Sequence, residues 1–319
     1  VAVKMLTSKM SGNEVVAQRF IQEAQAASSI GHPNIIEIFD FGEEPDGTHY
    51  MVMELLEGES LADRIRRRGR LPPGQAVAFA IQLLEGLQAA HEKGIVHRDL
   101  KPDNLFLVPT ESGGERLKIL DFGISKVTAE IDGNLTRTGA VMGTPFYMSP
   151  EQARGAKEID HRTDIWAAGV ILYQMLSGTQ PYHGQSYNEI ISKILMEAVP
   201  PLGEVVTDLP PPLVELVEHT LVKDAALRCP DCLAFMEALR SVEAEVDKVD
   251  SARAAEGMMQ TLAHTARPEI QDLGSAPTMD VPGGAQTPVA TVLGAAPTWK
   301  RGLWYLLTLP LAWGMMPAA

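Results

Sequence analysis

His97-Arg98-Asp99-Leu100-Lys101-Pro102-Asp103-Asn104 is the stretch of sequence that decides the fold of this chain. It brings a carboxylate, an ammonium group and an amide together on one short segment, and Asp121-Phe122-Gly123 adds another carboxylate further on. A lone His-Arg-Asp is weak evidence, because such tripeptides also occur in solvated loops. The full pattern, followed by the Asp-Phe-Gly triplet and then by the dipeptide Pro150-Glu151, is a strong and specific signal.

The residue types in these motifs suit phosphoryl transfer. That reaction needs a hydroxyl held in line, metal ions that span the phosphates, and positive charge facing the moving group. We expect Asp99 to accept the hydroxyl proton, Lys101 to reach the γ-phosphate and Asn104 to hold a magnesium ion. Asp121 supplies the second magnesium carboxylate. The predicted catalytic residues are therefore Asp99, Lys101 and Asn104, the predicted metal ligands Asn104 and Asp121, and the predicted cofactors ATP and Mg²⁺.

With its motifs in this order, the chain resembles a Ser/Thr protein kinase of the eukaryotic-like (Hanks) type, similar to membrane-anchored bacterial members, over about residues 1–239. The resemblance implies an α+β, two-lobed protein kinase fold, with a small β-rich N-lobe that is truncated here and a larger helical C-lobe. It also implies transfer of the γ-phosphoryl group of ATP to Ser and Thr hydroxyls of protein substrates. Residues 1–245 would form this domain.

The first residues fit the small lobe. Val1-Ala2-Val3-Lys4 alternates as a strand does, and it matches the family's strand whose lysine holds the α- and β-phosphates. Apolar residues at three- and four-residue spacing predict a helix over residues 11–29, with Glu23 on its apolar stripe. A carboxylate in that position needs a partner, so we expect an ion pair between Lys4 and Glu23. The alternative is that Glu23 reaches water.

The adenine site follows from the resemblance. Met53 would be the gatekeeper, and the backbone at Glu54 and Leu56 would hydrogen-bond adenine. Ala2 and Phe106 would sandwich the ring, although the family more often has an aliphatic residue at the second position. The strands around this site are expected at residues 35–41 and 49–55, joined by a turn over residues 43–47.

A basic run follows the adenine site. Ser60 is expected to cap a short helix that carries Arg64, Arg66, Arg67 and Arg68. These arginines either read acidic residues on a substrate or form a solvated helix face, and the second interpretation is favoured.

Residues 121–151 correspond to the activation segment. Thr136 and Thr138 lie in a polar stretch beside glycines, and a phosphate there could pair with Arg98 and order the segment. Autophosphorylation within a homodimer would switch the enzyme on. In the family, the hydroxyl at Thr144 meets the catalytic Asp and Lys and helps to select Ser and Thr substrates.

Two contacts are expected to hold the large lobe together. Residues 165–176 are apolar nearly all round the predicted helix and must be core. Asp164 at its buried start should accept backbone N–H groups from the catalytic loop. Glu151 is expected to pair with Arg228, which would pin the activation segment to the large lobe.

Composition excludes some functions. The net charge of −14 argues against a nucleic-acid partner, because phosphate backbones demand clustered Lys and Arg. Only Cys229 and Cys232 occur, so no disulfide framework is expected and a reducing cytoplasm fits. Their C-x-x-C spacing suggests zinc or redox chemistry, but a zinc site needs two more ligands. Two small core residues at a helix start are the favoured interpretation.

The Gly-rich loop that the family places before Lys4 is absent, and the chain begins at Val1. A fragment is the simpler explanation. The alternative is a catalytically impaired, pseudokinase-like binding scaffold, against which stand Lys4, Glu23 and the predicted catalytic residues.

The C-terminal part changes character. Residues 246–300, rich in Pro, Gly, Ala and Thr in their second half, predict a flexible juxtamembrane-type linker. Residues 301–319 form a candidate transmembrane segment, because residues 302–319 carry no charge and follow Lys300 and Arg301. This pattern predicts a cytoplasmic kinase domain anchored to the cell membrane. The alternatives are an apolar tail docked on the kinase and a chance ending of a fragment.

Overall fold

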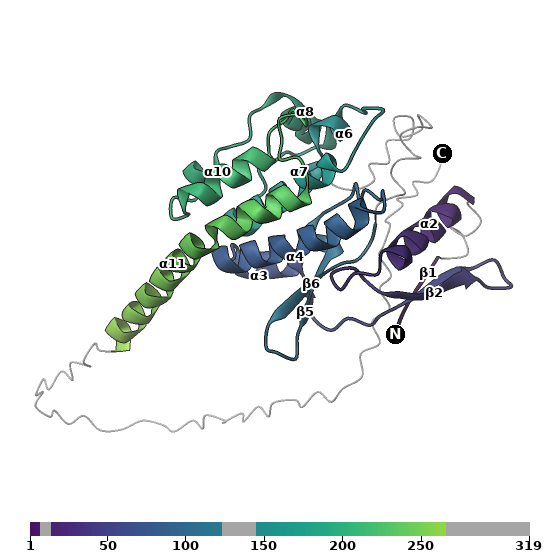
Figure 1. Ribbon diagram of the computed structural model, residues 1–319, viewed down its shortest axis with the longest axis horizontal. Coiled ribbons are helices and arrows are strands. Elements are labelled where there is room, and N and C mark those ends of the chain that lie inside the picture. Colours follow the sequence, from purple (N-terminus) through teal and green to yellow (C-terminus); the bar gives the residue numbers. More distant parts are fainter. Residues whose placement is uncertain (7–13, 123–144, 266–319) are drawn as a thin grey trace, which may run out of the picture. The chain divides into compact units, whose positions relative to one another are not determined.

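The computed structural model describes residues 1–6, 14–122 and 145–265 (Figure 1). The elements before the catalytic loop begin with a sheet and one helix, which make up the small lobe. They are β1 (Ala2–Met5), α2 (Glu14–Ile30), β2 (Ile38–Glu43) and β3 (His49–Met53). The sheet is antiparallel in the order β1-β3-β2, and Ala2 lies opposite Met53 in it.

Helix α2 forms because its apolar residues recur on one face. Its buried residues include Ala17, Phe20, Ala24 and Ala27, and this spacing is the one predicted from the sequence. Strand β2 begins and ends later than the predicted 35–41, whereas β3 begins at the predicted residue 49 and ends at Met53 rather than at residue 55. The segment before β2 turns away from the small sheet, since Ile35 forms a bridge with Ile119.

A second antiparallel sheet has the strand order β4-β5-β6, and its middle strand follows the catalytic loop directly in the sequence. Its strands are β4 (Glu59–Ser60), β5 (Leu105–Pro109) and β6 (Glu115–Ile119). The inward residues Leu105, Leu107, Leu117 and Ile119 are fully buried or nearly so. The 3-10 turn η1 (Pro102–Asn104) leads directly into β5, so the loop residues are held at the edge of a packed sheet.

The large lobe is helical. Its elements are α3 (Leu61–Arg68), α4 (Pro73–His91), η2 (Pro145–Tyr147), α6 (Pro150–Ala153), α7 (Arg162–Ser177), α8 (Tyr187–Met196), α9 (Leu202–Val205), α10 (Pro211–Thr220) and α11 (Cys232–Thr265). Helix α7 is buried along almost its whole length, and Trp166 on it is 1% exposed. The helix ends at Ser177 and is capped by Gly178, whose φ of 81° suits a residue without a side chain. These features confirm the predicted α+β organisation and the central core helix.

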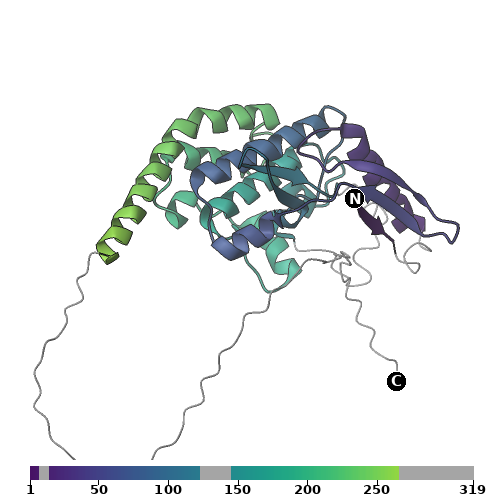
Figure 2. The same ribbon diagram turned by 90° about the horizontal axis from the view of Figure 1, so that it is seen from below.

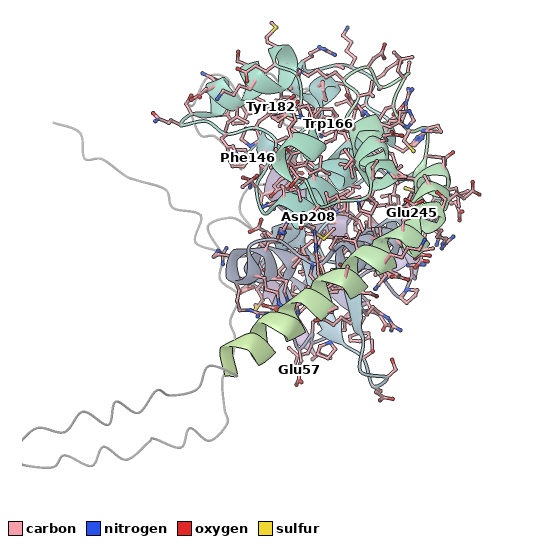
Figure 3. All side chains as sticks on the ribbon, turned by 90° about the vertical axis from the view of Figure 1, so that its left-hand side faces the viewer. Glu57, Phe146, Trp166, Tyr182, Asp208 and Glu245 are labelled. Atoms are coloured by element: carbon pink, nitrogen blue, oxygen red, sulfur yellow. The ribbon has the colours of Figure 1, made fainter. Side chains whose placement is uncertain are left out.

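Helix α11 extends beyond residue 245, where the sequence predicted a linker to begin. It lies against α4 (Figure 2), and Val246 on it is buried. Asp250 accepts a hydrogen bond of 2.7 Å from the backbone N–H of Gly74. Nη2 of Arg253 lies 2.7 Å from Oδ2 of Asp208, the residue labelled in Figure 3. Val246, Asp250 and Arg253 thus pack on the lobe, because each has a fixed contact there.

The remainder of the expected linker, 266–300, and the candidate membrane segment, 301–319, lie outside the described residues. Among the helices of the described residues, none has the length and hydropathy needed to cross a membrane.

Candidate active site

One buried carboxylate holds the backbone of the catalytic loop. Asp164, fully buried at the start of α7, accepts a hydrogen bond from the backbone N–H of His97 through Oδ2 and from that of Arg98 through Oδ1, both at 2.8 Å. The contact expected from the sequence is therefore present. Both oxygens of this buried carboxylate accept hydrogen bonds, and these bonds fix the loop backbone.

The predicted catalytic side chains lie together on this braced loop. Lys101 Nζ lies 3.7 Å from Asp99 Oδ2. The side-chain amide of Asn104 donates to the carbonyl oxygen of Asp99 at 3.1 Å. This bond occupies the amide nitrogen of Asn104, and so its amide oxygen is the atom suited to a cation.

The Asp-Phe-Gly motif begins close to the loop. The ring of Phe122 lies 4.9 Å from the ring of His97, and the backbone N–H of Leu120 donates to the carbonyl of Asn104 at 2.9 Å. Asp121 therefore follows a strand whose end is bonded to the catalytic loop. Its carboxylate and the amide oxygen of Asn104 are hard oxygen donors, which fit a magnesium ion.

Lys4 contacts a different carboxylate from the one expected. Its Nζ lies 2.9 Å from Oδ1 of Asp121, and the two side chains are 34% and 42% exposed. Glu23 is half-buried on α2. The Lys4–Glu23 pair stays a prediction, because the lysine in this structure is turned toward the Asp-Phe-Gly motif.

The expected adenine residues come from both sheets. Met53 ends β3 opposite Ala2 on β1, and Phe106 lies on β5. The backbone N–H of Glu54 donates to the carbonyl of Glu37 at 3.0 Å, so the atom of the Glu54 backbone suited to adenine is its carbonyl oxygen. Leu56 follows in the connection between β3 and β4.

Arg98 has an unusual conformation. Its φ of 65° lies in the left-handed region, which non-glycine residues rarely adopt, and Asp164 and Gln152 hold its backbone there. Its Nη2 donates to the carbonyl of Ile159 at 3.2 Å, and its buried Nε has no partner among the described residues. A strained arginine beside the catalytic loop with one donor to spare suits an anion.

Glu151 and Arg228 form the expected ion pair. Two parallel hydrogen bonds of 2.8 and 3.0 Å join them, and the arginine side chain is fully buried. The guanidinium also donates to the carbonyl of Arg162 and lies 5.2 Å from the ring centroid of Trp166. Helix α6 is thus tied to the core of the large lobe.

Two residues that were not predicted from the sequence link α6 to the catalytic loop. Ser149 and Gln152 form a capping box, and the Gln152 amide also donates to the carbonyl of Arg98 at 2.8 Å. The capping box could have been predicted from the sequence, because Ser-x-x-Gln at the start of a helix is the pattern of such a box.

The expected basic face is only partly solvated. Arg66 pairs with Asp63 at the surface, whereas Arg64 is buried and bonded to Glu59 and Glu115. Arg64 shares the inward face of α3 with Ile65, which explains the difference from the favoured interpretation.

The two cysteines are buried core residues, as the sequence favoured. Burial raises the pKa of the Cys229 thiol to about 11 and raises that of Cys232 as well, so both carry their proton at neutral pH. The predicted regulatory residues Thr136 and Thr138, and Thr144 of the substrate-selecting contact, lie outside the described residues.

Comparison with known proteins identifies the family to which these motifs belong. Residues 1–241 match the family model described as the protein kinase domain. The chain is 40% identical over 256 residues to the serine/threonine-protein kinase pkn3 of Myxococcus xanthus, covering 79% of this chain and 47% of that protein. It is 39% identical over 248 residues to PknA of Mycobacterium tuberculosis, covering 76% of this chain and 55% of that protein.

Solved structures give the same fold. The kinase domain of Mycobacterium tuberculosis PknI matches with a TM-score of 0.57 at 25% identity, covering 76% of this chain and 84% of that one. The chain spans about half the length of these two curated relatives.

Proposed function

The chain belongs to the protein kinase domain family, and we propose that it is an ATP-dependent Ser/Thr protein kinase. It would transfer the γ-phosphoryl group of ATP to Ser and Thr hydroxyls of proteins. The observation that carries the proposal is the catalytic loop itself, in which Asp99, Lys101 and Asn104 lie together on a backbone that Asp164 holds in place.

Each residue has a role in this reaction. Asp99 accepts the proton of the attacking hydroxyl, and Lys101 beside it sets a positive charge against the transferring phosphoryl group. Asn104 and Asp121 hold a divalent cation, which we propose to be Mg²⁺. When bound, this ion neutralises charge on the phosphates. Because little covalent chemistry is needed, positioning by the loop accounts for most of the catalysis.

Binding of nucleotide would exchange one ion pair for others. Lys4, now on Asp121, would turn to the α- and β-phosphates and to Glu23, which frees Asp121 for the cation. The adenine ring would lie between Ala2 and Phe106 beside Met53, with hydrogen bonds to the backbone of Glu54 and Leu56.

Regulation and location are part of the proposal. Arg98, with its spare buried donor, would pair with phosphothreonine at Thr136 or Thr138 after autophosphorylation between two copies of the chain. Residues 301–319 would anchor the kinase domain to a membrane through the linker before them. The alternative of a binding scaffold has no observation in its favour among the described residues.

The test uses the full-length protein with the variant Asp99→Asn. Removal of a general base should lower kcat about 10²- to 10⁴-fold while nucleotide binding stays nearly unchanged. Asp103→Asn is the matched control, because Asp103 is an exposed carboxylate on the same loop. Transfer at the wild-type rate by Asp99→Asn would refute the role of Asp99. A wild-type protein that binds ATP without transferring phosphate would favour the scaffold.

A further inference from the structure

A buried chain of three polar side chains lies beneath the catalytic loop. It joins Cys232 at the start of α11, His91 at the end of α4 and Asp164 at the start of α7. The Sγ of Cys232 lies 3.5 Å from Nδ1 of His91, and Nε2 of His91 lies 2.8 Å from Oδ2 of Asp164. All three are buried or nearly so, with the His91 side chain 8% exposed.

This series of hydrogen-bonded side chains ends at Oδ2 of Asp164, an atom that holds the catalytic loop. Oδ2 of Asp164 accepts from both the imidazole of His91 and the backbone N–H of His97, each at 2.8 Å. The position of this oxygen therefore depends on His91 as well as on the loop. If His91 ceased to donate, the carboxylate would keep its two hydrogen bonds from the loop backbone but lose the contact that fixes Oδ2 from α4, and its hold on the loop beside Asp99 would weaken.

His91 can donate to Asp164 only from Nε2, and the thiol favours this. Burial is the main reason that the pKa of Cys232 is raised, and the nearby charges of Asp164 and Asp231 raise it further. The thiol thus stays protonated and donates a hydrogen bond to Nδ1 of His91. A neutral imidazole that accepts at Nδ1 carries its own proton on Nε2, facing the carboxylate.

We propose that Cys232 is a positioning residue for phosphoryl transfer: its thiol holds His91 in the Nε2–H tautomer, and His91 in turn fixes Asp164 under the catalytic loop. The inference deepens the proposed kinase function and rests on it for its kinetic part. Its structural part, the tautomer of His91, is measurable whether or not the protein transfers phosphate.

The other groups that face this cluster are few among the described residues. The ring of His161 lies 5.5 Å from that of His91, and its Nε2 is bonded to the carbonyl of Pro230. Asp231 acts on Cys232 from the turn before α11. Without the thiol, Nδ1 of His91 would be buried and unpaired or would take up a proton. A charged imidazolium would draw Oδ2 of Asp164 away from His97.

The first experiment measures the tautomer directly. Long-range ¹H–¹⁵N NMR of protein labelled at histidine separates the two neutral tautomers and the imidazolium, and loss of the signal in His91→Gln assigns it. We expect the wild-type protein to show His91 in the Nε2–H form at neutral pH. Cys232→Ser, which keeps a donor, should retain this form, and Cys232→Ala should shift the signal toward the Nδ1–H form or the imidazolium.

The second experiment measures kinetics in the full-length protein. Loss of one such hydrogen bond should lower kcat about three- to tenfold in Cys232→Ala. The KM for ATP should change by about twofold or less. Cys232→Ser should restore most of the rate. Cys229→Ala is the matched control: Cys229 is also buried, but its thiol bonds to the carbonyl of Asp231 and not to His91.

The outcomes separate the hypotheses. A wild-type His91 in the Nδ1–H or imidazolium form overturns the proposal without any variant. An unchanged tautomer in Cys232→Ala also overturns it, as does an equal loss of rate in Cys232→Ala, Cys232→Ser and Cys229→Ala, which would indicate packing alone. A wild-type protein with no transferase activity refutes the proposed function. The tautomer of His91 then tests only the structural part of the proposal, the effect of Cys232 on His91.

Discussion

Replacement of Arg228 by Met should destabilise the large lobe strongly. The arginine side chain is fully buried and the Glu151 side chain is 16% exposed, so Arg228→Met would leave a largely buried carboxylate without its cation. The variant also leaves the carbonyl oxygens of Val222 and Arg162 without the hydrogen bonds that they accept from the same guanidinium. Removing one partner of a buried pair costs about 3–5 kcal/mol.

The loss should be visible in two measurements. A cost of that size corresponds to a fall in Tm of roughly 6–20 °C for a domain of this length. Urea unfolding, followed by far-ultraviolet circular dichroism, should show a lower midpoint with an unchanged slope. Since Glu151→Gln leaves the cation bonded to several carbonyl oxygens, this variant should lose less stability than Arg228→Met.

The control is an exposed pair of the same chemistry. Arg240 lies 3.3 Å from Glu85, and the two side chains are 52% and 38% exposed. Solvent screens such a pair, so Arg240→Met should cost about 0–1 kcal/mol. If Arg228→Met lost no more stability than Arg240→Met, the buried pair would not be what fastens α6 to the lobe. In addition, the double variant Glu151→Gln, Arg228→Met should lose less than the sum of the single variants.

Three further predictions concern regulation, pH and location. The double variant Thr136→Ala, Thr138→Ala should lose most activity, and mass spectrometry showing neither threonine modified in active protein would contradict this. The hydrogen bond from Arg64 lowers the pKa of Glu115 below its ordinary 4.5, so the pair contributes stability above that pH and loses it as the pH falls through the lowered value. Glu115→Gln should therefore flatten the acid side of the plot of urea midpoint against pH, and an unchanged slope would count against the pair. Deletion of residues 302–319 should move the protein from the membrane pellet to the supernatant of fractionated cells, and equal partition of both forms would exclude an anchor.

The sequence was most informative where one motif residue has one possible kind of partner. A carboxylate at the buried start of an apolar helix needs N–H donors, and Asp164 finds them in the catalytic loop. An arginine placed between two helices of a core needs an acid, and Arg228 finds Glu151. In both cases the cost of burying an unpaired charge leaves few alternatives, and so the contact is predictable without coordinates.

The sequence was less informative where several partners compete or where the helix phase decides. Lys4 has a long side chain with two carboxylates in prospect, and its contact with Asp121 depends on the arrangement of the segments around it. Arg64 belongs to a run of arginines that looks solvated, yet the phase of α3 turns this one inward. The contact between His91 and Cys232 joins residues 141 positions apart, and the C-x-x-C spacing of Cys232 gives no indication of it.

The two halves of the candidate site are held in different ways, and the difference suits their roles. The catalytic loop is fixed by backbone hydrogen bonds to the buried Asp164, which water cannot replace. Lys4 and Asp121 are joined by a single contact between side chains that are 34% and 42% exposed, and a pair so open to solvent contributes about 0–1 kcal/mol. Phosphates and a divalent cation can therefore displace this pair at little cost, whereas the loop that orients the hydroxyl stays in place. On this argument, nucleotide binding should rearrange Lys4 and Asp121 and leave the hydrogen bonds of Asp164 unchanged.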